Sequence, residues 1–161
     1  MRRARPDETA LVLDVLDAAA GRLAARGIAG WPAAFGPELI EPGLGAGKVW
    51  LAERAGTAVA TLTLYWSDEI WADDGRAGYV HRLATREAGT GLGAALLRWA
   101  AGAVRARGRD RLRLDCAAVN HALRAYYERA GFAHRGDLVV AYADVHLSGG
   151  LPTVSRYELV L

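Results

Sequence analysis

The stretch TREAGTGLGAALL, from Thr85 to Leu97, joins a glycine-rich turn to the start of an apolar helical pattern. Glycines lack Cβ atoms, so several backbone N–H groups can approach one anion there, and a helix N-terminus adds its positive dipole end. The stretch therefore predicts an anion-binding loop in front of a helix over residues 92–107. The sequence on either side indicates which anion it binds.

That surrounding sequence has the periodicity of an alternating α/β chain. Helices are expected over residues 7–26, 92–107 and 121–130. Strands are expected over residues 48–54, 57–66, 78–85, 111–116, 132–142 and 154–161. Loops are expected over residues 30–47 (with one helical turn near 37–40), 67–78 and around Ser148. No repeat or linker interrupts the pattern, so we expect residues 1–161 to form a single mixed α/β domain.

Composition and charge exclude several classes of protein. The net charge of +2 and the scattered arginines indicate no nucleic-acid partner. No apolar run reaches about 18 residues, so we expect no membrane span. Asp14 and Asp17 interrupt the apolar N-terminal segment, which favours a helix of the mature protein over a signal peptide. Cys116 is the single cysteine, which excludes an internal disulfide and favours a cytoplasmic protein.

Two nucleotide-binding motifs fit the glycine loop poorly. Gly89 to Ala94 matches the dinucleotide pattern G-x-G-x-x-A, and Asp110 and Asp115 follow about 20 residues on. However, a dinucleotide fold normally begins with this unit, whereas here a helix and a hairpin precede it. A P-loop needs a Gly-Lys pair followed by Ser or Thr, and Lys48 is followed by valine.

A third interpretation uses the sequence on both sides of the loop. LAT (83–85) precedes the loop GTGLG (89–93), and Asn120 lies seven residues before the tyrosine of YERAGF (127–132). In this order and spacing, over roughly residues 79–132, the chain resembles the GNAT superfamily of N-acetyltransferases. A tight packing turn without a ligand is the alternative for the loop itself.

The resemblance implies a fold, a cofactor and a set of cofactor-binding residues. The fold is a mixed, mostly antiparallel sheet of six to seven strands, flanked by helices, with a splayed parallel strand pair at the cofactor site. The cofactor is acetyl-CoA, whose extended pantetheine arm pairs with a strand edge as a peptide would. The residues implied are Leu83, Ala84, Thr85, Ala88, Gly89, Thr90, Gly91, Leu92, Gly93, Ala94, Asn120 and Tyr127.

The family's usual Gln or Arg before the glycines has no clear counterpart here. One alignment places Ala88 at that position, and another, one turn earlier, places Arg86 there. The AALL that follows Gly93 favours the first alignment, in which only the backbone would contact the anion.

Acetyl transfer to an amine needs a base for the amine and an acid for the leaving thiolate. Tyr127 is the candidate acid, because its spacing matches the family's tyrosine. Tyr126 and Tyr127 also fit a helical core stripe, which is the alternative role. His81 is the candidate base, since it alternates with Leu83 and Thr85 along one strand face and a free imidazole titrates near pH 6.5. Glu53 and Glu69 are its rivals.

The acceptor site has a weaker pattern. The segment WSDEIWADDG (66–75) combines carboxylates with Trp66 and Trp71, which suits a cationic amine, although a solvated loop explains it as well. Trp31 is included because the family often places that segment at the acceptor cleft. The four histidines show no ligand spacing with one another or with Cys116, so we expect no metal site.

Together these observations predict an acetyl-CoA-dependent N-acetyltransferase that acts by direct transfer. The acceptor is a primary amine of a small molecule, a protein N-terminus or a lysine. The chain is expected to be a monomer or a homodimer with no membrane or nucleic-acid partner. The alternative is a non-catalytic module that senses acyl-CoA.

Overall fold

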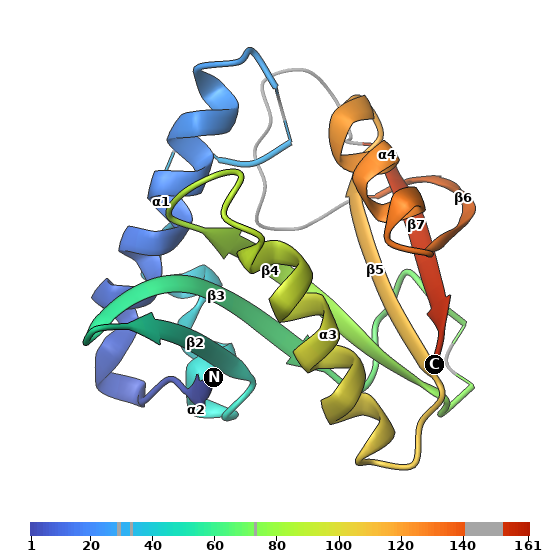
Figure 1. Ribbon diagram of the computed structural model, residues 1–161, viewed down its shortest axis with the longest axis horizontal. Coiled ribbons are helices and arrows are strands. Elements are labelled where there is room, and N and C mark those ends of the chain that lie inside the picture. Colours follow the sequence, from blue (N-terminus) through green and yellow to red (C-terminus); the bar gives the residue numbers. More distant parts are fainter. Residues whose placement is uncertain (29, 33, 73, 141–152) are drawn as a thin grey trace.

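The computed structural model of the chain describes residues 1–28, 30–32, 34–72, 74–140 and 153–161. The helices are α1 (Thr9–Ala24), α2 (Glu41–Gly45), α3 (Leu92–Arg105) and α4 (His121–Arg129). The strands are β1 (Arg2–Arg3), β2 (Val49–Arg54), β3 (Thr57–Tyr65), β4 (Ala77–Thr85), β5 (Arg111–Ala117), β6 (Ala133–Val139) and β7 (Thr153–Val160). They form one seven-stranded sheet in the order β1-β2-β3-β4-β5-β7-β6 (Figure 1).

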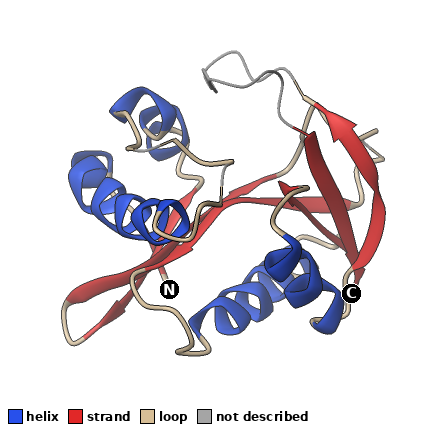
Figure 2. Cartoon of the chain, turned by 90° about the horizontal axis from the view of Figure 1, so that it is seen from above, coloured by secondary structure: helices blue, strands red, loops and turns tan. Residues whose placement is uncertain are grey.

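The sheet separates two helical layers (Figure 2). On one side α1 buries Val12, Val15 and Leu16 against the first half of the sheet, because the 3.6-residue period brings these residues onto one stripe. On the other side α3 and α4 cover the sheet, with Leu96, Leu97 and Val104 of α3 in the larger of the two cores. None of the helices in the described ranges has the length and hydropathy to cross a bilayer.

Two elements were not expected from the sequence. The strand β1 consists of two arginines that pair with Trp50 and Leu51, and such a short charged segment carries no strand pattern. The helix α2 lies in the segment expected as loop, and its sequence EPGLG contains three residues of low helix propensity. Burial of Leu44 in the core beside α1 compensates for that propensity. The loop expected around Ser148 lies outside the described residues.

The sheet is mostly antiparallel, with β4 and β5 as its parallel pair. These two strands pair over only four positions, from Ala77 opposite Arg111 to Val80 opposite Leu114. Beyond Val80 and Leu114 no pairing continues, although β4 runs on to Thr85 and β5 to Ala117. The expected fold is confirmed, including the divergence of the parallel pair.

A β-bulge interrupts β4 where this divergence begins. His81 lies opposite Thr63 of β3 and Ala84 lies opposite Thr61, so two residues of β4 face one residue of β3. Arg82 adopts a φ of 49°, which is left-handed and rare outside glycine. As a result Val80 packs in the core under α3 and Ala84 in the core under α1, although a regular strand would place them on one face.

The bulge corrects one expectation about the site. His81 precedes the extra residue, and so it shares the face opposite Val80. Leu83 follows the bulge and packs against the same core as Val80. The expectation that His81 and Leu83 share a face was therefore wrong.

Candidate functional site

The glycine loop connects the diverging end of β4 to α3. Gly89 and Gly91 adopt φ values of 75° and 74°, and Gly91 caps the helix in a left-handed conformation that any side chain would strain. The backbone N–H groups from Glu87 to Ala94 donate to no group of the residues that the structure describes. Free N–H groups at a helix N-terminus form a site for an anion.

Two arginines fix the start of this loop. The Arg22 guanidinium, from α1, donates to the carbonyl oxygens of Thr85 and Arg86. The Arg86 guanidinium donates to the carbonyl oxygen of Ala58 at 2.6 Å and pairs with Asp14 of α1. Since the Arg86 side chain is bound to these groups, the loop presents its backbone to a ligand.

The diverging strands leave polar groups on both sides of the gap. On the β4 side, the edge of Leu83, Ala84 and Thr85 has no strand partner from β5. On the β5 side, Asn120 caps α4 by accepting a hydrogen bond from the Leu123 N–H at 3.1 Å. The amide NH₂ of Asn120 makes no hydrogen bond within the described part of the chain, so its cap role leaves two donors for a ligand.

Tyr127 lies on α4, on the same side of the sheet as the glycine loop. Its ring is buried among Tyr126, Phe132 and Tyr157, with centroids 5.6–5.8 Å away. Burial raises the pKa of the Tyr127 hydroxyl well above its usual value, so this group keeps its proton. Tyr127 thus belongs to the core, as the alternative expected, and its hydroxyl is protonated.

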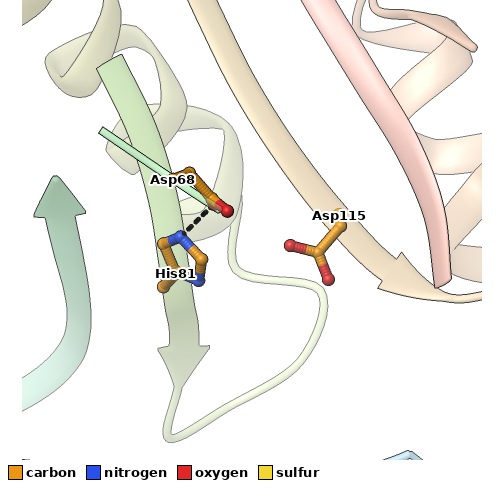
Figure 3. A group of neighbouring side chains, drawn as sticks. All are labelled: Asp68, His81 and Asp115. Carbon is orange, nitrogen blue, oxygen red and sulfur yellow. Dashed lines mark ion pairs between the residues drawn. The ribbon is translucent and has the colours of Figure 1, made fainter. Parts of the chain in front are cut away.

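His81 is held on the other side of the sheet. Its Nε2 lies 2.7 Å from Oδ2 of Asp68, whose side chain is only 8% exposed, and its ring meets Tyr65 edge-on. Asp68 also accepts a hydrogen bond from the Ile70 N–H at 3.0 Å, which fixes the carboxylate. Asp115 of β5 completes the group, and ligand atoms of Asp68, His81 and Asp115 lie within 4.8 Å of one another (Figure 3).

Asp115 reaches this group because alternate residues of β5 point to opposite faces. Leu112, Leu114 and Cys116 pack under α3, so Asp115 and Ala117 lie on the α1 side of the sheet. A Cβ placed on Gly30 would lie 2.5 Å from the Ala117 Cβ, so the segment after α1 passes close to the end of β5. The cluster therefore lies at the gap between the strands, on the face away from α3.

The other expected acceptor residues are dispersed. Glu53 pairs with Arg2 on the outer side of the sheet. Trp66 lies under the guanidinium groups of Arg107 and Arg109, at the C-terminal end of α3. Glu69 is exposed in the loop after β3.

Trp31 follows Gly30 and packs edge-on against Phe35 at 5.0 Å. Its neighbour Gly30 touches Ala117, so this segment does lie near the gap. In the loop after β3, Asp74 pairs with Arg113, and Trp71 lies between Arg113 and Arg156. Several of the carboxylates and aromatic rings expected to bind a cation therefore contact arginines of the protein itself.

Asp115 was not expected at the acceptor site, and Asp68 was expected only as one of the carboxylates of the 66–75 segment, with no contact to His81. The two aspartates lie 47 positions apart, in a loop and in a strand; the β3–β4 pairing brings Asp68 to His81, and the β4–β5 pairing brings Asp115. The alternation of RLRLDC around buried leucines does place Asp115 on the polar face of its strand, and this was the one available signal. No spacing rule predicts the approach of Asp68.

Comparison with known proteins agrees with this geometry. A model of the acetyltransferase (GNAT) family matches residues 15–132, and the chain belongs to that family. The uncharacterized N-acetyltransferase YesJ of Bacillus subtilis (strain 168) is 43% identical over 75 residues, which cover 44% of this chain and 42% of YesJ. The match thus spans less than half the length of this curated relative.

Solved structures share the fold over nearly the whole chain. A GNAT-family acetyltransferase from Listeria monocytogenes 4b F2365 superposes with a TM-score of 0.75 at 22% identity, covering 99% of this chain and 93% of that one. YncA of Salmonella typhimurium, solved with its cofactor acetyl-CoA, has a TM-score of 0.72 at 15% identity, covering 99% and 91%. At these identities the likeness concerns the fold.

Proposed function

We propose that this protein is an acetyl-CoA-dependent N-acetyltransferase that transfers the acetyl group directly to a primary amine. One observation carries the proposal: the backbone N–H groups from Glu87 to Ala94 have no acceptor among the described residues. A diphosphate group at the N-terminus of α3 would accept hydrogen bonds from them. The relative YncA, which was solved with acetyl-CoA, supports this choice of anion.

The rest of the cofactor fits the gap between β4 and β5. The pantetheine arm carries amides, which would pair with the β4 edge at Leu83 to Thr85 as an added strand does. The NH₂ group of Asn120 would donate to the arm from the other side. Bound in this way, acetyl-CoA would supply the thioester carbonyl that the amine attacks.

The side chains would then accept and donate the protons of the reaction. His81 accepts one proton from the ammonium, and Asp68 at 2.7 Å stabilises the imidazolium that results. Tyr127 donates its hydroxyl proton to the sulfur as the C–N bond forms and the C–S bond breaks. The second proton of the amine restores the Tyr127 hydroxyl. The products are an N-acetylated amine, the coenzyme A thiol and one proton on His81.

Cofactor binding tests the first part of the proposal. Gly91→Ala forces a side chain into a left-handed cap, so we expect its affinity for coenzyme A to fall roughly tenfold. Gly102→Ala, a matched change in the last turn of α3 with open space around it, should bind as the wild type does. Calorimetric titration with coenzyme A measures both. Equal affinities in both variants would argue against the loop as the anion site.

Turnover tests the second part. Thiol release from acetyl-CoA is followed with a panel of primary amines, and the proposal expects release that depends on the amine. Tight coenzyme A binding without turnover for any amine would favour the alternative function, a non-catalytic sensor of acyl-CoA.

A further inference from the structure

We infer that Asp115 and the Asp68–His81 pair form the binding site for the acceptor's ammonium group, and that the acceptor is a primary alkylammonium without a neighbouring carboxylate. This inference rests on the proposed function and assigns the substrate side of the same site. Asp115 is a binding residue in this arrangement, and Asp68 is a positioning residue that acts through His81.

The location of the cluster is the first argument. Its three side chains come from β4, β5 and the loop after β3, and they meet where β4 and β5 diverge (Figure 3). His81 and Asp115 point away from the face covered by α3, which carries the free N–H groups of the glycine loop. An acceptor on this face and a cofactor on the other would meet in the gap between the strands.

The hydrogen-bonding capacity of the cluster is the second argument. With Nε2 of His81 at 2.7 Å from Asp68, the neutral imidazole donates through Nε2 and keeps an acceptor at Nδ1. An ammonium has N–H donors only, and it needs acceptors such as this nitrogen and the Asp115 carboxylate. The cluster thus offers one group that neutralises the cation and one that removes its proton.

The charges around the cluster define the acceptor class. Asp68 and Asp115 are both carboxylates, and Glu69 is exposed on the same loop. The nearby Arg113 is paired with Asp74 and Glu158. Arg156, opposite Asp115 in the β5–β7 register, donates to the carbonyl oxygens of Ile70 and Arg135 and keeps its positive charge, but the three carboxylates outnumber it. A carboxylate beside the amine, as in a free amino acid, would meet repulsion here. A diamine or a simple alkylamine would not.

A metal ion is the competing occupant of the same three residues. A metal bound at Nε2 of His81, at about 2.1 Å, would have to replace the Asp68–His81 contact. A metal bound at Nδ1 would leave that contact intact, as would an ammonium hydrogen-bonded at roughly 2.9 Å. The contact alone therefore does not distinguish the two occupants, whereas removal of divalent metal with EDTA does.

The experiment measures amine binding and turnover separately. The probes are 1,4-diaminobutane, ethylamine and glycine, titrated calorimetrically into the complex with coenzyme A and then assayed with acetyl-CoA. The variants are Asp115→Asn, Asp115→Glu and Asp68→Asn. Asp7→Asn is the matched control, because Asp7 lies near the N-terminus and its side chain is 77% exposed. Thermal melts of each variant report its folding.

We expect wild type to prefer the two alkylamines to glycine. Asp115→Asn should raise both Kd and KM for these amines at least about tenfold, because a charged hydrogen bond is lost, while coenzyme A affinity stays constant. Asp115→Glu should recover part of the binding. Asp68→Asn should lower kcat roughly a hundredfold with a smaller change in KM, which a merely structural role would not produce.

Several results would overturn the inference: amine affinity unchanged in Asp115→Asn, glycine bound as well as ethylamine, or activity that EDTA abolishes and a divalent metal restores. If the amines bind through Asp115 but no acetyl transfer follows, the ammonium site stands and the proposed function fails. If transfer occurs with no effect of Asp115→Asn, the function stands and the ammonium site fails.

Discussion

At the scale of single residues, Tyr127 combines a core position with a chemical role. Its hydroxyl belongs to a side chain buried on the α3 side of the sheet, and burial raises its pKa. A group with a raised pKa stays protonated at neutral and alkaline pH, and in the proposed mechanism this proton goes to the departing thiolate. Tyr127 would therefore not cause activity to fall as the pH rises towards 10.

Tyr127→Phe tests this role. The change removes one oxygen and keeps the ring in its aromatic cluster, so we expect kcat to fall by about 10²–10⁴ while coenzyme A affinity changes little. Steady-state thiol release and calorimetric titration measure the two quantities. A variant with wild-type kcat would remove Tyr127 from the mechanism.

Tyr126 offers the matched control for that variant. Its buried hydroxyl has no hydrogen-bond partner among the described residues and lies 3.1 Å from the position that a Cβ on Gly93 would take. Removal of an unsatisfied hydroxyl relieves a desolvation cost, so Tyr126→Phe should raise the free energy of unfolding by roughly 1 kcal/mol. Chemical denaturation measures this change, and a loss of stability would show that the hydroxyl has a partner in solution.

The residues that could be predicted from the sequence are those with a local sequence pattern. The glycines of the loop and Asn120 have backbone roles that fixed spacing reveals, and Asn120 caps α4 in the structure. Asp68 and Asp115 have no such pattern, because their approach to His81 depends on how β3 and β5 pair with β4. Residues whose role depends on contacts between distant segments were therefore not predicted from the sequence.

At the scale of elements, the bulge in β4 controls which side chains reach which face. Arg82 carries its left-handed φ of 49° without being glycine, so no residue type indicates the bulge and the pattern alone predicts regular alternation. The same irregularity separates the His81 face from the Leu83 face. It also leaves one residue of β4 beside the gap without a partner directly opposite it in β3.

Substitutions at Arg82 test the bulge. Arg82→Gly removes the backbone strain and should leave stability unchanged or raise it slightly, whereas Arg82→Val should lower the free energy of unfolding by roughly 1–3 kcal/mol, because β-branched residues resist this conformation. Urea denaturation of both variants gives the comparison. Equal stabilities of the glycine and valine variants would mean that the bulge is absent in solution.

At the scale of the whole molecule, the α1 layer is joined to the sheet through arginine contacts as well as through apolar packing. Arg22 of α1 binds the carbonyl end of β4, and Arg2 of β1 bridges Glu8 in the turn before α1 to Glu53 of β2. The long elements of this plan follow from hydrophobic periodicity, and their order was predicted. The short N-terminal strand was not, because its contribution comes from charge and pairing partners distant in the sequence.

The Glu8 pair makes stability depend on pH in a definite direction. The Arg2 guanidinium binds both carboxylate oxygens of Glu8, at 2.7 and 2.8 Å, and the Arg5 N–H donates to it at 2.7 Å. These contacts, the Arg2 hydrogen bonds foremost, lower the pKa of Glu8 from 4.5 to about 2 despite its burial. A lowered pKa in the folded state means that the stabilisation is complete above pH 4.5 and disappears as the pH falls towards 2.

The size of the shift corresponds to roughly 3 kcal/mol. We therefore expect Glu8→Gln to be less stable than wild type by about that amount at pH 7, and the difference should close between pH 4.5 and 2. Thermal or urea unfolding across this range measures it. Asp7→Asn is the control, an adjacent substitution at an exposed position. Its stability should follow that of the wild type across this pH range. A constant gap between Glu8→Gln and wild type from pH 7 to 2 would mean that Glu8 stabilises the fold by packing alone, and that β1 is joined to the turn before α1 without the ion pair.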